Sequence, residues 1–103
     1  MLLWLDDVRP MPVGFDLWAK TYGQAIEMIK AHDITFISFD HDLGTKETGY
    51  DVACFIENRA VRGIKPPDWA IQSSNPVGSN NIRMTMQSAH DYYSRVHDEL
   101  EME

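Results

Sequence analysis

The chain has 103 residues, with 16 acidic and 9 lysine or arginine side chains and a formal net charge of −7 at pH 7. This length predicts one domain over residues 1–103. The excess of negative charge argues against nonspecific binding to DNA, because it repels a phosphate backbone. A small phosphorylated ligand stays compatible with the charge, since a bound metal ion reverses the field inside an acidic pocket.

The single cysteine and the first residues bear on the cellular compartment. Cys54 has no second cysteine with which to form an internal disulfide, as is typical of proteins in a reducing cytoplasm. Residues 1–5 are apolar, but they have no basic flank and are followed at once by Asp6 and Asp7. We therefore expect no signal peptide, no membrane-spanning segment and no membrane partner.

The first third of the chain predicts two strands and a helix. Leu2–Leu5 is apolar on both faces, as in a central parallel strand. The loop at residues 8–14 contains two prolines and a glycine, and Phe15–Ala19 predicts a short second strand. Thr21 is a suitable N-cap for a helix that ends near His32. The apolar residues at helical spacing are Tyr22, Ala25, Ile26 and Ile29.

The rest of the chain continues to alternate strands with helices. Ile34–Phe39 predicts a buried strand, and a helix is expected from Tyr50 to about Gly63. Trp69–Ile71 predicts a short strand, and Ser79 is the expected N-cap of the last helix. The inward positions of that helix are Ile82, Met86, Ala89, Tyr93, Val96 and Leu100. Its apolar stripe is compatible with core packing or with a homodimer interface.

This alternation predicts an α/β domain with a small, mostly parallel sheet and helices packed on it. Polar clusters follow three of the strands, at residues 6–7, 40–42 and 73–75. Each cluster taken alone is equally well interpreted as a set of loop or helix caps. Because parallel strands place their carboxyl ends at one edge, the three clusters are expected to meet there, which favours a functional pocket.

Carboxylates at such an edge suggest a hard cation. Clustered oxygen ligands suit Mg²⁺ or Mn²⁺ better than zinc, which prefers Cys and His. Asp7 and Asp40 are the expected ligands, with Asp6 or Asp42 completing the coordination directly or through water. His41 lies between two of these acids and suits either a general acid or base or a hydrogen-bond donor that orients them.

The same edge offers groups for a phosphate. The hydroxyls of Ser73 and Ser74, and the backbone N–H groups of the helix expected near Ser79, are suitable donors to an anion. Arg9 and Lys46 lie on loops that leave this edge, where they would neutralise ligand charge or simply face water. A cation and a phosphate would then bind side by side.

Four motifs in this chain also occur together in a known family. In this order, and over nearly the whole chain, they resemble the pattern of the cyclic-phosphate processing receiver-like domains, which are similar to response-regulator receiver domains. The motifs are Asp6-Asp7-Val8-Arg9-Pro10-Met11-Pro12, Asp40-His41-Asp42-Leu43-Gly44, Thr48-Gly49-Tyr50-Asp51 and Ser73-Ser74-Asn75-Pro76-Val77-Gly78.

The resemblance implies a receiver-like or flavodoxin-like fold of about four strands in the order 2-1-3-4, lacking the usual first helix and last strand. It also implies a divalent-metal pocket that hydrolyses or processes cyclic phosphate esters of nucleotides or RNA ends. In that role Asp40 and His41 would be catalytic. The metal ligands would come from Asp6, Asp7, Asp40 and Asp42, and the phosphate contacts from Arg9, Ser73, Ser74, Asn75 and Gly78.

Two positions depart from the related patterns. The late-strand lysine of receiver domains has no counterpart, which argues against phosphotransfer to Asp40. Gln72 stands where a histidine is expected before the serine of the last motif. The alternative hypothesis is therefore a module that binds a phosphorylated ligand, or a protein partner, without chemistry.

Overall fold

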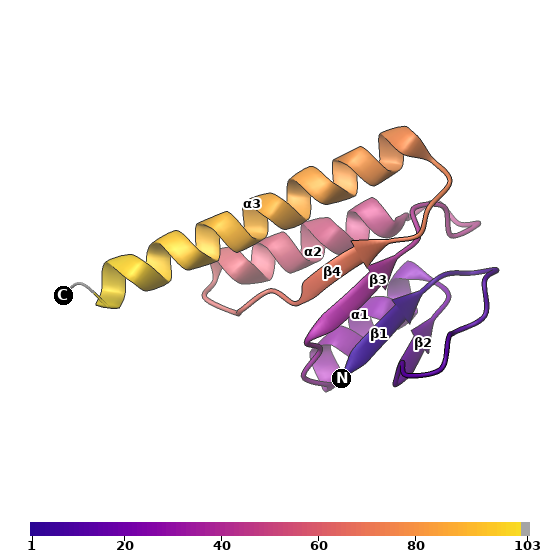
Figure 1. Cartoon of the computed structure of the whole chain (residues 1–103), viewed down its shortest axis with the longest axis horizontal. Coiled ribbons are helices and arrows are strands. Elements are labelled where there is room, and N and C mark those ends of the chain that lie inside the picture. Colours follow the sequence, from indigo (N-terminus) through magenta and orange to yellow (C-terminus); the bar gives the residue numbers. More distant parts are fainter. Residues whose placement is uncertain (102–103) are drawn as a thin grey trace.

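The computed structural model describes the backbone of residues 1–101 and the side chains of residues 1–98. These residues contain four strands and three helices; the first two strands are consecutive, and helices and strands alternate after them (Figure 1). In order they are β1 (Leu2–Leu5), β2 (Leu17–Ala19), α1 (Tyr22–Ala31), β3 (Phe36–Phe39), α2 (Gly49–Val61), β4 (Asp68–Ile71) and α3 (Pro76–Glu101). Among these helices, none combines the length and the apolar character that a membrane crossing requires.

The four strands form one parallel sheet in the order β2-β1-β3-β4, which confirms the predicted topology. In the register of the sheet, Leu3 of β1 lies beside Ile37 of β3, which in turn lies beside Trp69 of β4. Since all strands run the same way, the residues that follow β1, β3 and β4 lie at one edge. That edge is where the three polar clusters were expected to meet.

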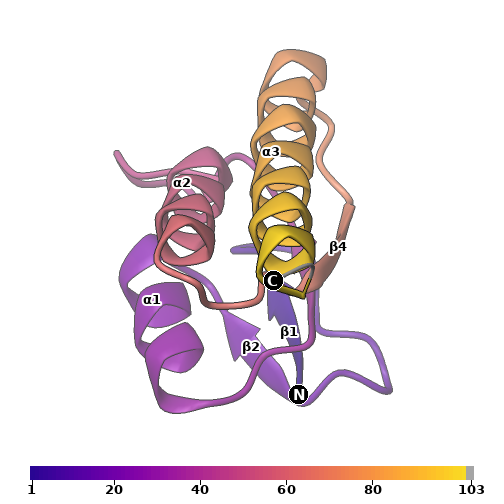
Figure 2. The same cartoon turned by 90° about the vertical axis from the view of Figure 1, so that its left-hand side faces the viewer.

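The core lies between the sheet and the helices. Leu3, Leu5, Ile37 and Phe39 are fully buried and belong to the same hydrophobic cluster as residues of all three helices. Alternate residues of a strand point to opposite faces, so these four side chains define the face that the helices cover. Figure 2 shows α1 and α2 on this side of the sheet, with α3 lying beside α2.

The opposite face is partly covered by the loop between β1 and β2, which occupies the place of the first helix of a receiver fold. Phe15 packs edge-on against Trp4, with ring centroids 5.2 Å apart, and lies 6.2 Å from the ring of Phe36. Trp4 is buried as a result. The aromatic side chain of this loop therefore buries apolar surface on a face of the sheet that a helix covers in a complete receiver fold.

Most predicted boundaries agree with the structure to within two residues. Thr21 caps α1 as expected, because its side chain accepts a hydrogen bond from the Gln24 N–H at 3.2 Å. The expected start of α3 was wrong: the helix begins at Pro76 rather than at Ser79. Asn75 is the cap, with its Oδ1 accepting from the Gly78 N–H at 2.9 Å. Proline is favoured at the first position of a helix, where no N–H is needed.

The interior of α3 follows the predicted pattern. Ile82, Met86 and Ala89 are buried, and Tyr93 and Val96 are half-buried. The predicted inward side chain of residue 100 lies outside the described part of the structure. The second half of α3 extends beyond α2 (Figure 1). A homodimer through this helix stays a prediction.

Candidate metal and phosphate site

The site lies at the carboxyl ends of β1, β3 and β4. Asp6 directly follows β1, and the ladder continues for one residue past the other two strands. The Asp40 N–H donates to Leu5 at 2.8 Å, and the Gln72 N–H donates to Phe39 at 2.9 Å. The backbone of the sheet itself therefore positions Asp6 and Asp40, the first residues of their polar clusters, and Gln72, which directly precedes the third cluster.

Asp6, Asp7 and Asp40 form an acidic cluster. One carboxylate oxygen from each residue lies within 4.8 Å of the other two. Asp6 is fully buried, Asp40 is buried and Asp7 is half-buried. This spacing allows the three oxygens to share one cation, so three of the four predicted metal ligands are brought together.

The Asp6 carboxylate is held by its own loop. Its Oδ1 accepts hydrogen bonds from the N–H groups of Val8 (2.9 Å) and Arg9 (2.7 Å), as aspartates commonly do at turns. Two indoles also fix this loop: Trp18 donates to the Asp6 carbonyl at 2.8 Å, and Trp4 donates to the Arg9 carbonyl at 2.9 Å. Both tryptophans were expected only as strand residues, and their hydrogen bonds to this loop were not predicted from the sequence.

Arg9 bends back over the acidic cluster. Its Nη1 lies 3.4 Å from Oδ2 of Asp6 and 4.0 Å from Oδ1 of Asp40. The same nitrogen donates a hydrogen bond to the backbone carbonyl of Gln72, at the end of β4. The guanidinium thus connects the loop after β1 to the ends of both β3 and β4.

The environment of Asp40 raises the pKa of its carboxyl group. Burial is the main cause that raises the pKa of this carboxyl, and the charge of Asp6 and, to a smaller extent, Asp7 adds to it. The backbone N–H of His41 and the charge of Arg9 act in the opposite direction. The net result is a raised pKa, as expected for a buried carboxyl group with other carboxylates nearby.

Asp42 lies apart from the acidic cluster. Its side chain is 65% exposed and accepts from His41 Nδ1 at 3.0 Å, and Asn75 Nδ2 lies 3.4 Å from its other oxygen. The hydrogen bond with His41 is the main cause that lowers the pKa of Asp42, and the one with Asn75 adds to it. Asp42 is therefore hydrogen-bonded to His41 and Asn75, and it is not one of the three acids of the cluster.

Two glycines let the helices approach the loop after β3. A Cβ at Gly49 would lie 2.0 Å from the carbonyl oxygen of Asp40, and a Cβ at Gly78 would lie 2.3 Å from the His41 ring. Thr48 caps α2 beside this contact, with its N–H donating to Asp51 at 2.7 Å. The motif at residues 48–51 is thus explained by packing, because it docks the start of α2 on the backbone of Asp40.

An open cleft of about 380 Å³ lies over the acidic cluster. Of the residues predicted to bind phosphate, Arg9 and Ser74 line it. Gly44 also lines it, at φ 68°, and a Cβ there would lie 3.2 Å from Oδ2 of Asp7, so glycine permits this close approach. The complete lining is Asp6, Asp7, Val8, Arg9, Asp40, Asp42, Gly44 and Ser74.

The other residues predicted to contact phosphate, Ser73, Asn75 and Gly78, form hydrogen bonds with one another beside the cleft. Ser73 Oγ accepts from the Asn75 N–H at 3.1 Å, and Asn75 in turn caps α3 through the Gly78 N–H. Gln72 points into the sheet, where its side-chain amide donates to the carbonyl of Leu5 at 3.0 Å. These groups hold the loop after β4 in place, and they are not part of the cleft lining.

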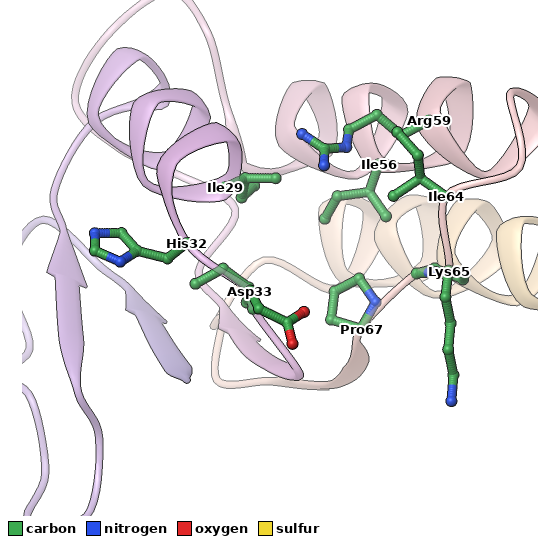
Figure 3. Close-up of a pocket in the computed structure, with 10 residues that line it drawn as sticks. Ile29, His32, Asp33, Ile56, Arg59, Ile64, Lys65 and Pro67 are labelled. Atoms are coloured by element: carbon green, nitrogen blue, oxygen red, sulfur yellow. The ribbon is translucent and has the colours of Figure 1, made fainter.

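A second hollow lies at the opposite end of the sheet, beside the residues that precede β3 and β4 (Figure 3). Its volume is only about 60 Å³, and Ile29, Ile56 and Pro67 are among the residues that line it. The side chain of Lys65 points away from it (Figure 3). This hollow is too small for a nucleotide, since ligand pockets usually measure several hundred Å³.

Comparison with known proteins agrees with this architecture. No curated protein and no solved structure matches the chain. The family model described as "Cyclic-phosphate processing Receiver domain" matches residues 1–88, which include every strand and the whole acidic cluster. The chain therefore belongs to the cyclic-phosphate processing receiver domain family.

Proposed function

We propose that this protein binds Mg²⁺ or Mn²⁺ at Asp6, Asp7 and Asp40 and uses it to process a cyclic phosphate ester of a nucleotide or an RNA end. The observation that carries the proposal is the meeting of three carboxylate oxygens within 4.8 Å beneath an open cleft. The family supports the choice of a cyclic phosphate as the ligand.

The acidic cluster fits a hard divalent cation. All of its donors are carboxylate oxygens, and no cysteine or histidine belongs to it, which disfavours zinc. Three negative charges face a single guanidinium, so the cluster has charge left to be neutralised. The hydrogen bonds to Asp6 Oδ1 also hold that carboxylate in a fixed orientation, as the outer contacts of metal ligands usually do.

A bound divalent cation polarises phosphoryl oxygens and lowers the pKa of a coordinated water. Around it, the side chains of this protein position the ligand. Ser74 and Arg9 line the cleft and would donate hydrogen bonds to phosphate oxygens. Asp40 is the central carboxylate, because it comes from the middle of the sheet and lies between the loop of Asp6 and the start of α2.

Binding without turnover is the second candidate function, and the position of His41 favours it. The ring packs against Gly78 and is hydrogen-bonded to Asp42, and it is not one of the residues that line the cleft. Among the lining residues of the described structure there is no histidine, lysine, cysteine or tyrosine that would exchange a proton near neutral pH. Asp42 would then serve mainly to hold His41.

The test is a heteronuclear NMR titration with Mg²⁺, followed by a 2′,3′-cyclic nucleotide, with product formation measured in parallel. We expect Mg²⁺ to shift the resonances of Asp6, Asp7 and Asp40, and Asp40→Asn to weaken this binding at least tenfold. Asp68→Asn is the matched control, because Asp68 is an exposed acid at the opposite end of the sheet.

The outcomes separate the two candidate functions. Product that depends on both the cation and Asp40 supports processing, whereas cation-dependent binding without product supports the binding module. A protein whose spectrum does not respond to Mg²⁺ or Mn²⁺, or an Asp40→Asn variant that responds like the parent, would refute the metal site.

A further inference from the structure

The position of Arg9 links this residue to the metal affinity of the site. Its guanidinium lies within ion-pair distance of two of the three carboxylates in the acidic cluster, Asp6 at 3.4 Å and Asp40 at 4.0 Å. Asp6 is fully buried, whereas the side chain of Arg9 is 46% exposed, so water screens this pair only from the Arg9 side. Arg9 therefore already supplies positive charge where a cation would bind.

The backbone of Arg9 keeps the guanidinium there. The Arg9 N–H donates to Asp6, and the Arg9 carbonyl accepts from the indole of Trp4. At its far end the side chain donates to the carbonyl of Gln72. With its backbone and its guanidinium both hydrogen-bonded, the partly exposed side chain of Arg9 is held over the acidic cluster.

A divalent cation would share these carboxylates with the guanidinium. Mg²⁺ binds carboxylate oxygens at about 2.1 Å, so a cation on Oδ2 of Asp6 would lie no more than about 5.5 Å from Nη1 of Arg9. At that distance two positive charges repel each other, and each loses part of its interaction with the same oxygens.

We infer that Arg9 competes with the divalent cation for Asp6 and Asp40 and so lowers the metal affinity of the cluster. This inference rests on the proposed metal site and deepens it. The competition also assigns Arg9 a second partner, because a guanidinium displaced from the carboxylates is free to meet the phosphate of the ligand in the same cleft.

The test compares the Mn²⁺ affinity of the parent protein with that of three variants, by calorimetry and by thermal unfolding. Arg9→Gln removes the charge, and Arg9→Lys keeps it. Arg62→Gln is the matched control, since Arg62 is exposed at the far end of α2 and its loss changes the net charge equally. Circular dichroism in EDTA verifies that each variant is folded.

We expect Arg9→Gln to bind Mn²⁺ about tenfold more tightly than the parent, with Arg9→Lys and Arg62→Gln within about threefold of it. At a Mn²⁺ concentration ten times the parent Kd, the metal-induced rise in Tm should be about twice as large in Arg9→Gln, because stabilisation follows the logarithm of the ratio of ligand concentration to Kd.

Each alternative outcome has a distinct meaning. Equal or weaker Mn²⁺ binding by Arg9→Gln would overturn the competition while leaving the metal site intact. Equally tight binding by Arg9→Lys and Arg9→Gln would also overturn it, because charge would not be the cause. No binding by the parent or by any variant would refute the metal site itself.

Discussion

Replacing Gly49 with alanine tests the contact that joins α2 to the site. The added Cβ would lie 2.0 Å from the carbonyl oxygen of Asp40 and 3.0 Å from its carbonyl carbon. Ordinary contacts begin near 3.4 Å, so α2 or the Asp40 backbone would have to move by at least 1.4 Å. Both are backbone groups of the folded core, and neither relaxes by a change of rotamer.

The expected cost follows from this overlap. Overpacking of a well-packed interior costs about 1–3 kcal/mol. Alanine restricts the unfolded chain more than glycine does, which offsets up to about 1 kcal/mol of this cost. A backbone overlap of this size places the cost at the upper end of that range, so the net loss is about 2 kcal/mol, which lowers the Tm of a domain of this size by about 8–16 °C. We therefore expect Gly49→Ala to be strongly destabilised.

Gly23→Ala is the matched control. Gly23 is also near the start of a helix, α1, but a Cβ there would meet nothing within 4 Å. Alanine is preferred to glycine within helices by about 0.5–1 kcal/mol, so this variant should be slightly more stable than the parent. Urea and thermal unfolding, followed by circular dichroism, would measure both variants. Equal stability of Gly49→Ala and Gly23→Ala would refute the close packing of α2 on Asp40.

Two further predictions concern Asp40 and Asn75. Because the folded state raises the pKa of Asp40, ionised Asp40 destabilises the protein above that pKa, and this cost disappears as the pH falls below the ordinary value of 3.8. In EDTA, the free energy of unfolding of Asp40→Asn should therefore exceed that of the parent at pH 7, and the difference should shrink toward pH 3.8. A difference that does not change with pH would show that ionisation of Asp40 is not its cause. Asn75→Ala removes the cap of α3 and should cost about 1 kcal/mol in urea unfolding, whereas Asn58→Ala, at an exposed position of α2, should cost little. The same change should raise the pKa of Asp42, measured by NMR, because Asn75 is one of the two residues whose hydrogen bonds lower it; an unchanged pKa would mean that His41 alone lowers it.

Local patterns in the sequence were sufficient to predict the strands and helices, and the end of the sheet at which the polar clusters lie. The apolar runs at Leu2–Leu5 and in the segment before Asp40 predicted the central strands, and helical spacing with Thr21 as the cap predicted α1. These signals are local, since strand and helix periods extend over only a few residues. The start of α3 is also encoded locally, because Asn75-Pro76 combines an N-cap residue with a proline at the first helical position, a signal that competes with Ser79.

What the sequence determined by itself is the set of polar groups at one edge, because parallel strands must bring their carboxyl ends together. What only the tertiary structure decided is which of those polar groups contact one another. Asp42 pairs with Asn75, which lies 33 positions away, and Arg9 reaches the carbonyl of Gln72, which lies 63 positions away. No local period encodes such contacts, because they depend on side-chain directions and on how closely the helices approach the sheet at Gly49 and Gly78. The acidic cluster of Asp6, Asp7 and Asp40 follows from the topology, whereas the arginine that covers it follows from packing.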